Sequence, residues 1–283
     1  MVKKYFLASN SANGFFSLYG SFPPDGAYLH VIKGGPGTGK SSFMRSLGKR
    51  AEEMGYEAEY VLCSGDPASL DGVYIPALKT AWSDGTAPHT AEPRLFGVDA
   101  DYVNLGQFCR TPLSADDAAE AARLNAVNKG EYAKAYKLLS EAGAAREHKS
   151  VCSPARRIFL SAISRDGRVS LYEALADFKT LTASYDELGD MISAHKSSSE
   201  CIICLDPLLP DRAEALILPN CRTVIRAKAE GGASDALIAQ ACEHIRAAGL
   251  AHDELERIYK KYMDYDALNE FTEAYSEKLF DIM

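Results

Sequence analysis

The chain has 283 residues, of which 47% are hydrophobic and 25% are charged, a balance typical of a folded globular protein and not of a disordered one. Its formal net charge of −8 disfavours a general nucleic-acid or anionic-membrane surface, so we expect no nucleic-acid partner. The sequence lacks a signal-peptide pattern and any run of about 18 uninterrupted apolar residues, which predicts a cytoplasmic protein with no membrane contact.

The first strongly predicted elements are a strand at 27–33, a glycine-rich loop and a helix that begins near Lys40. Residues 34–41 read GGPGTGKS, which fills the G-x-x-x-x-G-K-[ST] template of the Walker A motif, or P-loop. Apolar residues recur at helical spacing after Lys40, and Gly55 is expected to end that helix. The glycines let consecutive N–H groups wrap a phosphate, and the helix adds its positive end. The segment therefore predicts a nucleoside triphosphate site.

Each residue type in the loop has an expected role. Lys40 would reach the β- and γ-phosphates and offset the charge that develops during transfer, which makes it a candidate catalytic residue. Ser41 would ligate Mg²⁺ through its hydroxyl, and Ser42 would support the α-phosphate side. The predicted nucleotide-binding residues are Gly34, Gly35, Pro36, Gly37, Thr38, Gly39, Lys40, Ser41 and Ser42. The structural alternative, a chance glycine-rich turn, is disfavoured because strand, loop and helix agree.

A phosphoryl-transfer site also needs an acidic residue near Mg²⁺, commonly at the C-terminal end of a strand beside the P-loop strand. Asp66 follows the strand-like segment 59–63, and Asp84 follows the strand-like segment 78–82. We favour Asp84 for the metal because it opens a polar turn that ends at His89, which joins Lys40, Asp66 and Asp84 as a fourth candidate catalytic residue. The alternatives stay open, since both aspartates stand in sequences that favour turns and a histidine in a polar loop is commonly only solvated.

Two further stretches indicate helices with a structural role. The region 114–150 predicts a helical hairpin, because Ser114 and Asp117 resemble a capping box and apolar residues mark one helix face after Gly130. A similar stripe at 255–263 indicates core packing and not a ligand site.

The seven cysteines are unevenly spaced and predict no disulfide framework. Cys201 and Cys204 form a C-x-x-C pair. Its interior is apolar and β-branched, which favours a buried strand over a metal or redox site.

Two parts of the chain match each other. Residues 3–19 align with 156–172 without a gap, and more weakly the segment from Cys63 aligns with the segment from Cys204. These matches predict an internal duplication with two α/β halves. The first, at 1–150, would be the P-loop nucleotide-binding domain with the helical hairpin, and the second, at 151–283, would end in helices.

The second half is predicted to be degenerate. Between the matched segments the first half has 43 residues (20–62) and the second half only 31 (173–203). The segment 176–185 stands where the P-loop should be, and it contains no glycine. Ala227 takes the place of Asp84. The expected fold is therefore a P-loop NTPase-type parallel sheet flanked by helices, with a second, nucleotide-free α/β lobe. A single domain with accidental similarities is the alternative.

The order of GGPGTGKS, the segment 63–73 and the Asp-Gly-Thr-Ala-Pro-His segment 84–89 resembles a family of bacterial P-loop ATPase-like proteins. That family typically has two P-loop halves, each with an Asp-[Gly/Ser]-Thr-Ala-Pro-His segment, and the resemblance spans most of the chain. It implies ATP binding and hydrolysis. This chain departs from the family pattern in its second half, which lacks both motifs.

The leading expectation is an Mg²⁺-dependent ATP-binding protein that hydrolyses ATP as a nucleotide-driven switch, with ATP and Mg²⁺ as its cofactors. The first alternative is a small-molecule kinase, in which Asp66 or Asp84 orients an acceptor hydroxyl and His89 steadies the transferred group. The second alternative is a non-catalytic nucleotide sensor. The sequence does not identify the small-molecule or protein partner that any of these would need.

Overall fold

The computed structural model describes residues 2–87, 95–144, 150–151, 153–194, 201–228, 232 and 234–281. These residues form an α/β protein with two mixed sheets, of six and five strands. The chain divides into two compact units: unit 1 comprises residues 1–18, 63–67 and 131–247, and unit 2 comprises residues 19–62, 68–130 and 248–283. The units therefore interleave along the sequence, whereas the predicted repeat divides it once near residue 150.

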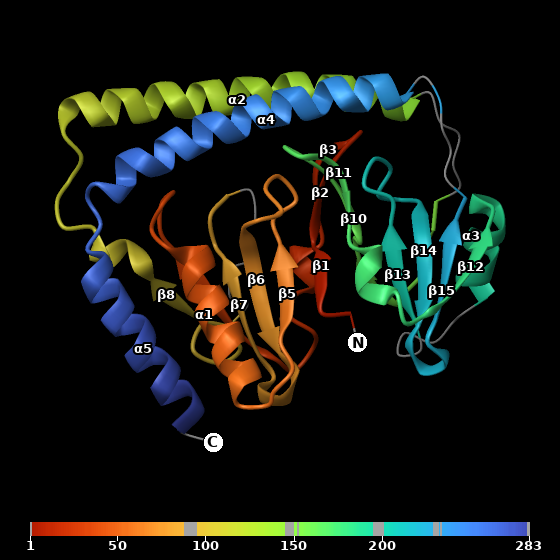
Figure 1. The fold of residues 1–283 in the computed structure, drawn as a ribbon, viewed down its shortest axis with the longest axis horizontal. Helices are drawn as coiled ribbons and strands as arrows, with labels where there is room; N and C mark the ends of the chain where they lie inside the picture. Colours follow the sequence, from red (N-terminus) through yellow and green to blue (C-terminus); the bar gives the residue numbers. More distant parts are fainter. Residues whose placement is uncertain are drawn as a thin grey trace. The chain divides into compact units, whose positions relative to one another are not determined.

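Unit 2 contains the GGPGTGKS loop and five strands in the order β5-β6-β7-β4-β8. Of these, β5, β6, β7 and β8 are labelled in Figure 1. Its elements are η1 (Tyr19–Ser21), β4 (Tyr28–Lys33), α1 (Lys40–Glu53), β5 (Glu59–Leu62), β6 (Leu70–Ile75), η2 (Pro76–Leu78), β7 (Thr80–Asp84), β8 (Ala100–Asn104), η3 (Leu105–Phe108), the first part of α2 (Ala115–Ala144), the last part of α4 (Ser234–Lys260) and α5 (Tyr265–Asp281). The predicted strand before the loop and the predicted helix after it are confirmed as β4 and α1.

The sheet of unit 2 is mixed, so the prediction of a parallel sheet is wrong. β4 runs parallel to β7 and β8, but β6 runs antiparallel to both β5 and β7. The reason is the length of the connections, since only residues 63–69 join β5 to β6 and only residues 76–79 join β6 to β7. A parallel connection needs about a dozen residues or more, so these short links permit only antiparallel neighbours.

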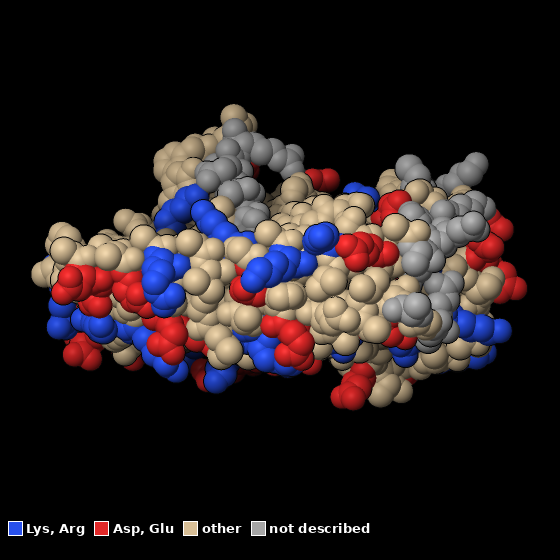
Figure 2. Space-filling view, turned by 90° about the horizontal axis from the view of Figure 1, so that it is seen from above, with Lys and Arg blue, Asp and Glu red and all other residues tan. Residues whose placement is uncertain are grey.

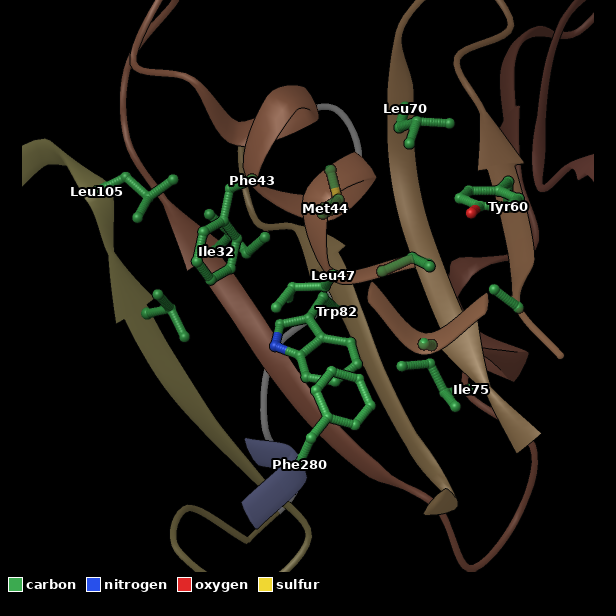
Figure 3. Packing of buried hydrophobic residues seen from close by; sticks show 14 of the residues in the cluster. Ile32, Phe43, Met44, Leu47, Tyr60, Leu70, Ile75, Trp82, Leu105 and Phe280 are labelled. Carbon is green, nitrogen blue, oxygen red and sulfur yellow. The ribbon is translucent and has the colours of Figure 1, made fainter. Parts of the chain in front are cut away.

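One face of this sheet is covered by α1 and α5, which share a hydrophobic core (Figure 3). Ile32 of β4 and Trp82 of β7 point into that core, where they meet Phe43 of α1 and Phe280 of α5. The fully buried indole of Trp82 donates its N–H to the hydroxyl of Tyr275 at 3.1 Å. Burying side chains of this size contributes about 1.5 to 3 kcal/mol each. The C-terminal helix is therefore an integral part of unit 2.

Unit 1 contains the strand order β12-β15-β14-β13-β9 and two hairpins, β2-β3 and β10-β11. β14 is antiparallel to both of its neighbours, and the outer pairs are parallel. Its elements are β1 (Lys4–Phe6), β2 (Ala8–Ser11), β3 (Gly14–Ser17), the last part of α2, β9 (Arg156–Ile158), β10 (Ser161–Ser164), β11 (Gly167–Ser170), η4 (Tyr172–Leu175), β12 (Lys179–Ala183), α3 (Tyr185–Ala194), β13 (Ile202–Leu205), β14 (Ala213–Leu218), η5 (Pro219–Cys221), β15 (Thr223–Ala227) and the first part of α4. Cys201 and Cys204 are buried at β13, so the predicted buried strand is confirmed.

The two units share one plan of strands and helices. The order β4-α1-β5-β6-η2-β7 in unit 2 matches β12-α3-β13-β14-η5-β15 in unit 1, and the matching strands are neighbours in the same order in each sheet. Each β-hairpin shifts register at the same place, before Leu62 and before Leu205. The short helices η2 and η5 both end at a residue of positive φ, Lys79 at 48° and Arg222 at 46°. A repeat predicts agreement of this kind.

This register refines the weaker of the two sequence matches. Leu62 corresponds to Leu205, so Cys63 corresponds to Asp206 and not to Cys204. The sequence match, which pairs Cys63 with Cys204, is therefore out of register with the strands. At the far end of the hairpins the predicted correspondence of Asp84 with Ala227 holds, because β7 and β15 pair with β6 and β14 in equivalent registers.

The N-terminal parts of the two matched segments meet inside unit 1 through reciprocal backbone hydrogen bonds. The bonds, with the donor first, are Phe6 to Phe159 and Phe159 to Phe6 at 2.9 Å each, Ala12 to Leu208 at 2.9 Å and Arg165 to Gly65 at 3.0 Å. When each residue is replaced by its equivalent in the other half of the repeat, each of these bonds becomes another one of them. Such reciprocity is the property of a two-fold isologous interface, here formed within one chain.

The helix α2 is continuous through Gly130, so the predicted helical hairpin is wrong. Ser114 caps it as expected, since its hydroxyl accepts the N–H of Asp117 at 3.2 Å. An internal glycine costs only about 1 kcal/mol relative to alanine, which packing on a partner helix can outweigh. That partner is α4, which lies beside α2 (Figure 1), and the side-chain amide of Asn128 donates to the carbonyl of Ala248 at 2.9 Å.

The outer surfaces of α2 and α4 carry both signs of charge side by side (Figure 2). Ion pairs one turn apart in these helices are Arg123–Glu120, Lys134–Glu131, Arg246–Glu243, Arg257–Glu254 and Lys260–Glu256. Interspersed charge of this kind is typical of helix faces in contact with solvent. Within the described part of the chain, no helix has the combination of length and apolar composition that crossing a bilayer requires.

Candidate functional site

The loop at 34–39 joins the end of β4 directly to the first turn of α1. Gly37 (φ 69°) and Gly39 (φ 85°) adopt the left-handed conformation that side chains disfavour. The helix begins at Lys40, and the N–H groups of its first turn have no partner within the helix. The predicted end of α1 is confirmed by Gly55, which has a φ of 85° just beyond the last helical residue. The backbone thus has the strand, glycine loop and helix N-terminus that bind anions in other proteins.

The ammonium of Lys40 lies among polar groups of the loop. Its Nζ atom donates to the carbonyl oxygens of Gly34 at 3.0 Å and Gly35 at 2.8 Å. A carboxylate oxygen of Asp84 lies 3.7 Å from the same nitrogen. The two charged side chains are only 11% and 14% exposed, so their attraction is less screened than that of a surface ion pair. The positive charge is therefore held at the loop before any ligand binds.

Asp84 reaches the loop through the neighbouring strand. It is the last residue of β7 and lies opposite Ile32 in the parallel pairing with β4. Its Oδ1 accepts the N–H of Thr86 at 2.8 Å, and the Thr86 hydroxyl donates to the carbonyl of Gly34 at 3.1 Å. The structure therefore brings Asp84 and Lys40 together, as the position of Asp84 at a strand end led us to expect. Thr86 supplies the hydroxyl expected in the polar turn that Asp84 opens, and its bond to the loop carbonyl is an additional contact.

The hydroxyl groups of the loop differ in what they contact. Ser41 accepts the backbone N–H of Leu70 at 2.9 Å, which leaves a second lone pair on its oxygen. The Thr38 hydroxyl donates to the carbonyl of Gly35 at 2.9 Å and is buried, so it shapes the loop. Ser42 is exposed in the first turn of α1.

The other two candidate residues do not belong to the described part of unit 2. Asp66 belongs to unit 1, whereas the loop belongs to unit 2. A carboxylate oxygen of Asp66 lies 3.7 Å from the guanidinium of Arg165, and the backbone N–H of Arg165 donates to the carbonyl of Gly65. These contacts support the alternative in which Asp66 stabilises a turn. His89 lies outside the described residues, and its role stays a prediction.

The end of α4 and the start of α5 lie against the loop, which the sequence did not predict. The hydroxyl of Tyr265 donates to the carbonyl of Gly37 at 2.6 Å. A Cβ atom at Gly37 would lie 2.8 Å from the carbonyl oxygen of Glu256. A Cβ atom at Gly39 would lie 2.8 Å from a methyl group of Leu268. Glycine is therefore required here by the approach of these helices as well as by the backbone conformation.

The stripe at 255–263 packs as predicted, and it also reaches the loop. Leu255 and Ile258 are buried in a cluster with α2, and Tyr259 and Tyr262 pack against that cluster. The ring of Tyr259 also comes within 3.6 Å of the position that a Cβ atom at Gly35 would occupy. The run of glycines in the loop was the one sequence signal that other groups approach it closely. Glycines alone do not identify the segment of the chain that supplies those groups.

The corresponding place in unit 1 has a direct connection from strand to helix. Ser184 alone joins the end of β12 to the start of α3. It forms a capping box with Glu187, since the Ser184 N–H donates to the carboxylate at 2.7 Å and the Glu187 N–H donates to the serine hydroxyl at 3.2 Å. A one-residue connection whose N–H and hydroxyl are both engaged leaves no loop to wrap a phosphate. This junction of unit 1 therefore has no equivalent of the loop at 34–39.

A scan against protein-family models and searches of curated proteins and of solved structures found no match for this chain. The resemblance to P-loop ATPase-like proteins therefore stays a prediction, and the geometry around Lys40 is the basis for assigning a function.

Proposed function

We propose that unit 2 binds a nucleoside triphosphate at residues 34–42 and hydrolyses it with Mg²⁺. The observation that carries the proposal is the position of the Lys40 ammonium, which bonds two loop carbonyls and lies 3.7 Å from the Asp84 carboxylate. A lysine, a glycine loop at a helix N-terminus and a carboxylate on the adjacent strand are the parts that phosphoryl transfer requires. The choice of ATP as the nucleotide rests on the family resemblance.

Each group has a distinct task in this proposal. The N–H groups of the loop and of the first turn of α1 would hold the phosphate oxygens, and Lys40 would offset the negative charge that grows on them during transfer. Ser41 and Asp84 supply oxygen donors, which suit Mg²⁺, and the metal would neutralise charge on the phosphates. Among the described residues no group of three or more His, Cys, Asp or Glu side chains could hold a metal ion, so phosphate and water would have to complete its ligands.

The proposal includes an internal duplication in which the second lobe has lost its nucleotide chemistry. It is supported by the shared order of strands and helices, the equivalent register shifts and the reciprocal bonds within unit 1. The capped connection at Ser184 and the replacement of Asp84 by Ala227 affect the two features that binding and transfer need. One lobe would thus serve the nucleotide and the other would serve as its structural partner.

The proposal is tested by titrating ATP and ADP, each with Mg²⁺, into the wild-type protein in a calorimeter and then measuring phosphate release from the same samples. We expect saturable binding with one site per chain, followed by slow release of phosphate. Binding without release would favour a sensor, or a kinase that lacks its acceptor. Absence of binding to both nucleotides would contradict the proposal.

Asp84→Asn is expected to abolish most of the effect of Mg²⁺ on ATP affinity and to leave metal-free binding in place. Asparagine can still accept the Thr86 N–H, so the turn after β7 is preserved while the metal loses a charged ligand. The measurement is the ratio of ATP affinity with Mg²⁺ to ATP affinity with a chelator. We expect this ratio to be about tenfold lower in Asp84→Asn than in the wild type, as for the loss of one charge-assisted contact. Asp25→Asn, an exposed residue of the same unit, is the matched control. An unchanged ratio in Asp84→Asn would remove the metal role from this residue.

A further inference from the structure

The elbow between α4 and α5, residues 261–264, is fixed to the rest of unit 2 by several contacts. The backbone N–H of Asp264 donates to the carbonyl of Phe108, and the N–H of Arg110 donates to the carbonyl of Tyr262, at 2.8 Å each. The Asp264 carboxylate pairs with the Arg110 guanidinium at 2.9 Å and accepts the N–H of Ala267 at 3.1 Å, which caps α5. The first residue of α5, Tyr265, is therefore held in a defined place.

The hydroxyl of Tyr265 contacts one peptide plane of the loop at 34–39. It donates to the carbonyl of Gly37 at 2.6 Å. The peptide between Gly37 and Thr38 is trans, so its N–H points away from its C=O. Because the carbonyl is directed at Tyr265, the N–H of Thr38 is directed away from α5. The pKa of a tyrosine is ordinarily about 10 and burial raises that of Tyr265 further, so its hydroxyl is protonated and able to donate at neutral pH.

The glycine at this position leaves the plane free to rotate unless something holds it. Gly37 has no side chain to restrict its dihedral angles, and its φ of 69° is open to glycine without penalty. The carbonyls of Gly34 and Gly35 have a donor from within the loop segment, since Lys40 bonds both. The Gly37 carbonyl is bonded by a helix more than 200 residues further along the chain.

We infer that Tyr265 is a positioning residue for the phosphate-binding loop, which holds the Gly37–Thr38 peptide so that the Thr38 N–H is available to a phosphate oxygen of the triphosphate. This inference rests on the proposed function of the loop. It assigns a role in phosphate binding to the first residue of α5, a residue that the sequence analysis did not single out. Preorganisation of a donor that would otherwise have to be ordered on binding increases affinity.

The test compares Tyr265→Phe with Tyr262→Phe. Both remove one hydroxyl from the same region, but the Tyr262 hydroxyl bonds Asp117 and the N–H of Ser114 and not the loop. The affinities for Mg·ATP and for Mg·tripolyphosphate are measured by calorimetry, with Lys40→Ala included. We expect Tyr265→Phe to lose about fivefold in affinity for both ligands, the size of one hydrogen bond, and Tyr262→Phe to lose none.

A spectroscopic readout separates positioning from general destabilisation. In protein labelled with ¹⁵N-threonine, the Thr38 amide resonance of the wild type should shift downfield when Mg·tripolyphosphate binds, and in Tyr265→Phe that shift should be smaller at saturation. Equal losses of affinity in Tyr262→Phe and Tyr265→Phe would overturn the inference. It would also be overturned if the ligand-induced shift of the Thr38 resonance were as large in Tyr265→Phe as in the wild type.

Failure of the inference is distinguishable from failure of the proposed function. Wild-type binding that Lys40→Ala removes and Tyr265→Phe retains in full would overturn the role of Tyr265 alone. A wild-type protein that binds neither ligand would overturn the proposed function, and the role of Tyr265 with it.

Discussion

Lys40→Ala is expected to lower the affinity for Mg·ATP by about 100-fold or more and to abolish phosphate release, with the fold preserved. The Lys40 ammonium donates to the loop carbonyls of Gly34 and Gly35. In the complex, phosphate oxygens would replace these carbonyls as the partners of the ammonium. Charge-assisted hydrogen bonds to phosphate contribute about 1.5 to 3 kcal/mol each, and tenfold in affinity corresponds to about 1.4 kcal/mol. The measurement is calorimetry with Mg·ATP together with a phosphate-release assay.

The matched control is Lys49→Ala, which removes the same charge from the exposed face of the same helix. Its affinity should stay within about twofold of the wild type, because solvent and salt screen a surface charge. The thermal unfolding midpoints of the two variants are compared to show that neither is unfolded. Equal affinity in wild type and Lys40→Ala would refute the assignment of the loop as a triphosphate site.

The features predicted correctly are those that neighbouring residues determine. The strand before the loop, the helix from Lys40 and its stop at Gly55 follow from hydrophobic spacing and from the conformation that glycine permits. Asp84 was expected beside the loop because it follows a strand, and two parallel strands place their carboxyl ends together. In both cases the information lies within a short stretch of sequence.

The features that were missed depend on segments far apart in the chain. Nothing in the composition of 255–263 distinguishes a tyrosine that packs against a glycine loop from one that faces a helix partner. The bond from Tyr265 to Gly37 spans 228 residues, and a stripe pattern describes only the helix that carries it. Similarly, α2 continues through Gly130 because α4 packs along it, and local signals favoured a break there.

The direction of β6 was a different kind of error. The P-loop motif suggested a parallel sheet by analogy, but the connections on both sides of β6 are too short to cross over a sheet face. Connection length was visible in the sequence, and it would have predicted antiparallel neighbours had the strand at 70–75 been identified. The strand at 70–75 is not evident from its sequence because it contains Asp71 and Gly72, residue types with low strand propensity.

The acidic residue in this strand occurs in both units. In unit 2 the buried Asp71 accepts a hydrogen bond from the Tyr19 hydroxyl at 3.2 Å. At the equivalent place in unit 1 the buried Glu214 accepts one from the Tyr172 hydroxyl at 3.1 Å. A hydrogen-bonded carboxyl group on the second strand of the hairpin is thus common to both halves. In unit 1 its surroundings predict a measurable effect of pH.

The pKa of Glu214 is raised to about 7, chiefly because burial disfavours the charged form and secondly because Asp206 is near. The Ser161 hydroxyl at 2.7 Å and the Arg168 guanidinium at 3.6 Å oppose this shift only in part. The folded protein therefore keeps a proton on Glu214 between pH 4.5 and 7, where the unfolded chain has lost it. Stability from this group is fully present below pH 4.5 and is lost as the pH rises to about 7.

Glu214→Gln is expected to raise the thermal unfolding midpoint at pH 8 by several degrees and to change it little at pH 5. Glutamine resembles the protonated carboxyl group and carries no charge to desolvate, so the variant avoids a cost of about 3 kcal/mol that the wild type incurs above pH 7. The measurement is the midpoint of both proteins at intervals from pH 5 to pH 8. Glu277→Gln on the exposed face of α5 is the control, and its curve should follow that of the wild type. Parallel curves for wild type and Glu214→Gln across this range would show that Glu214 ionises in the folded protein as it does in the unfolded chain.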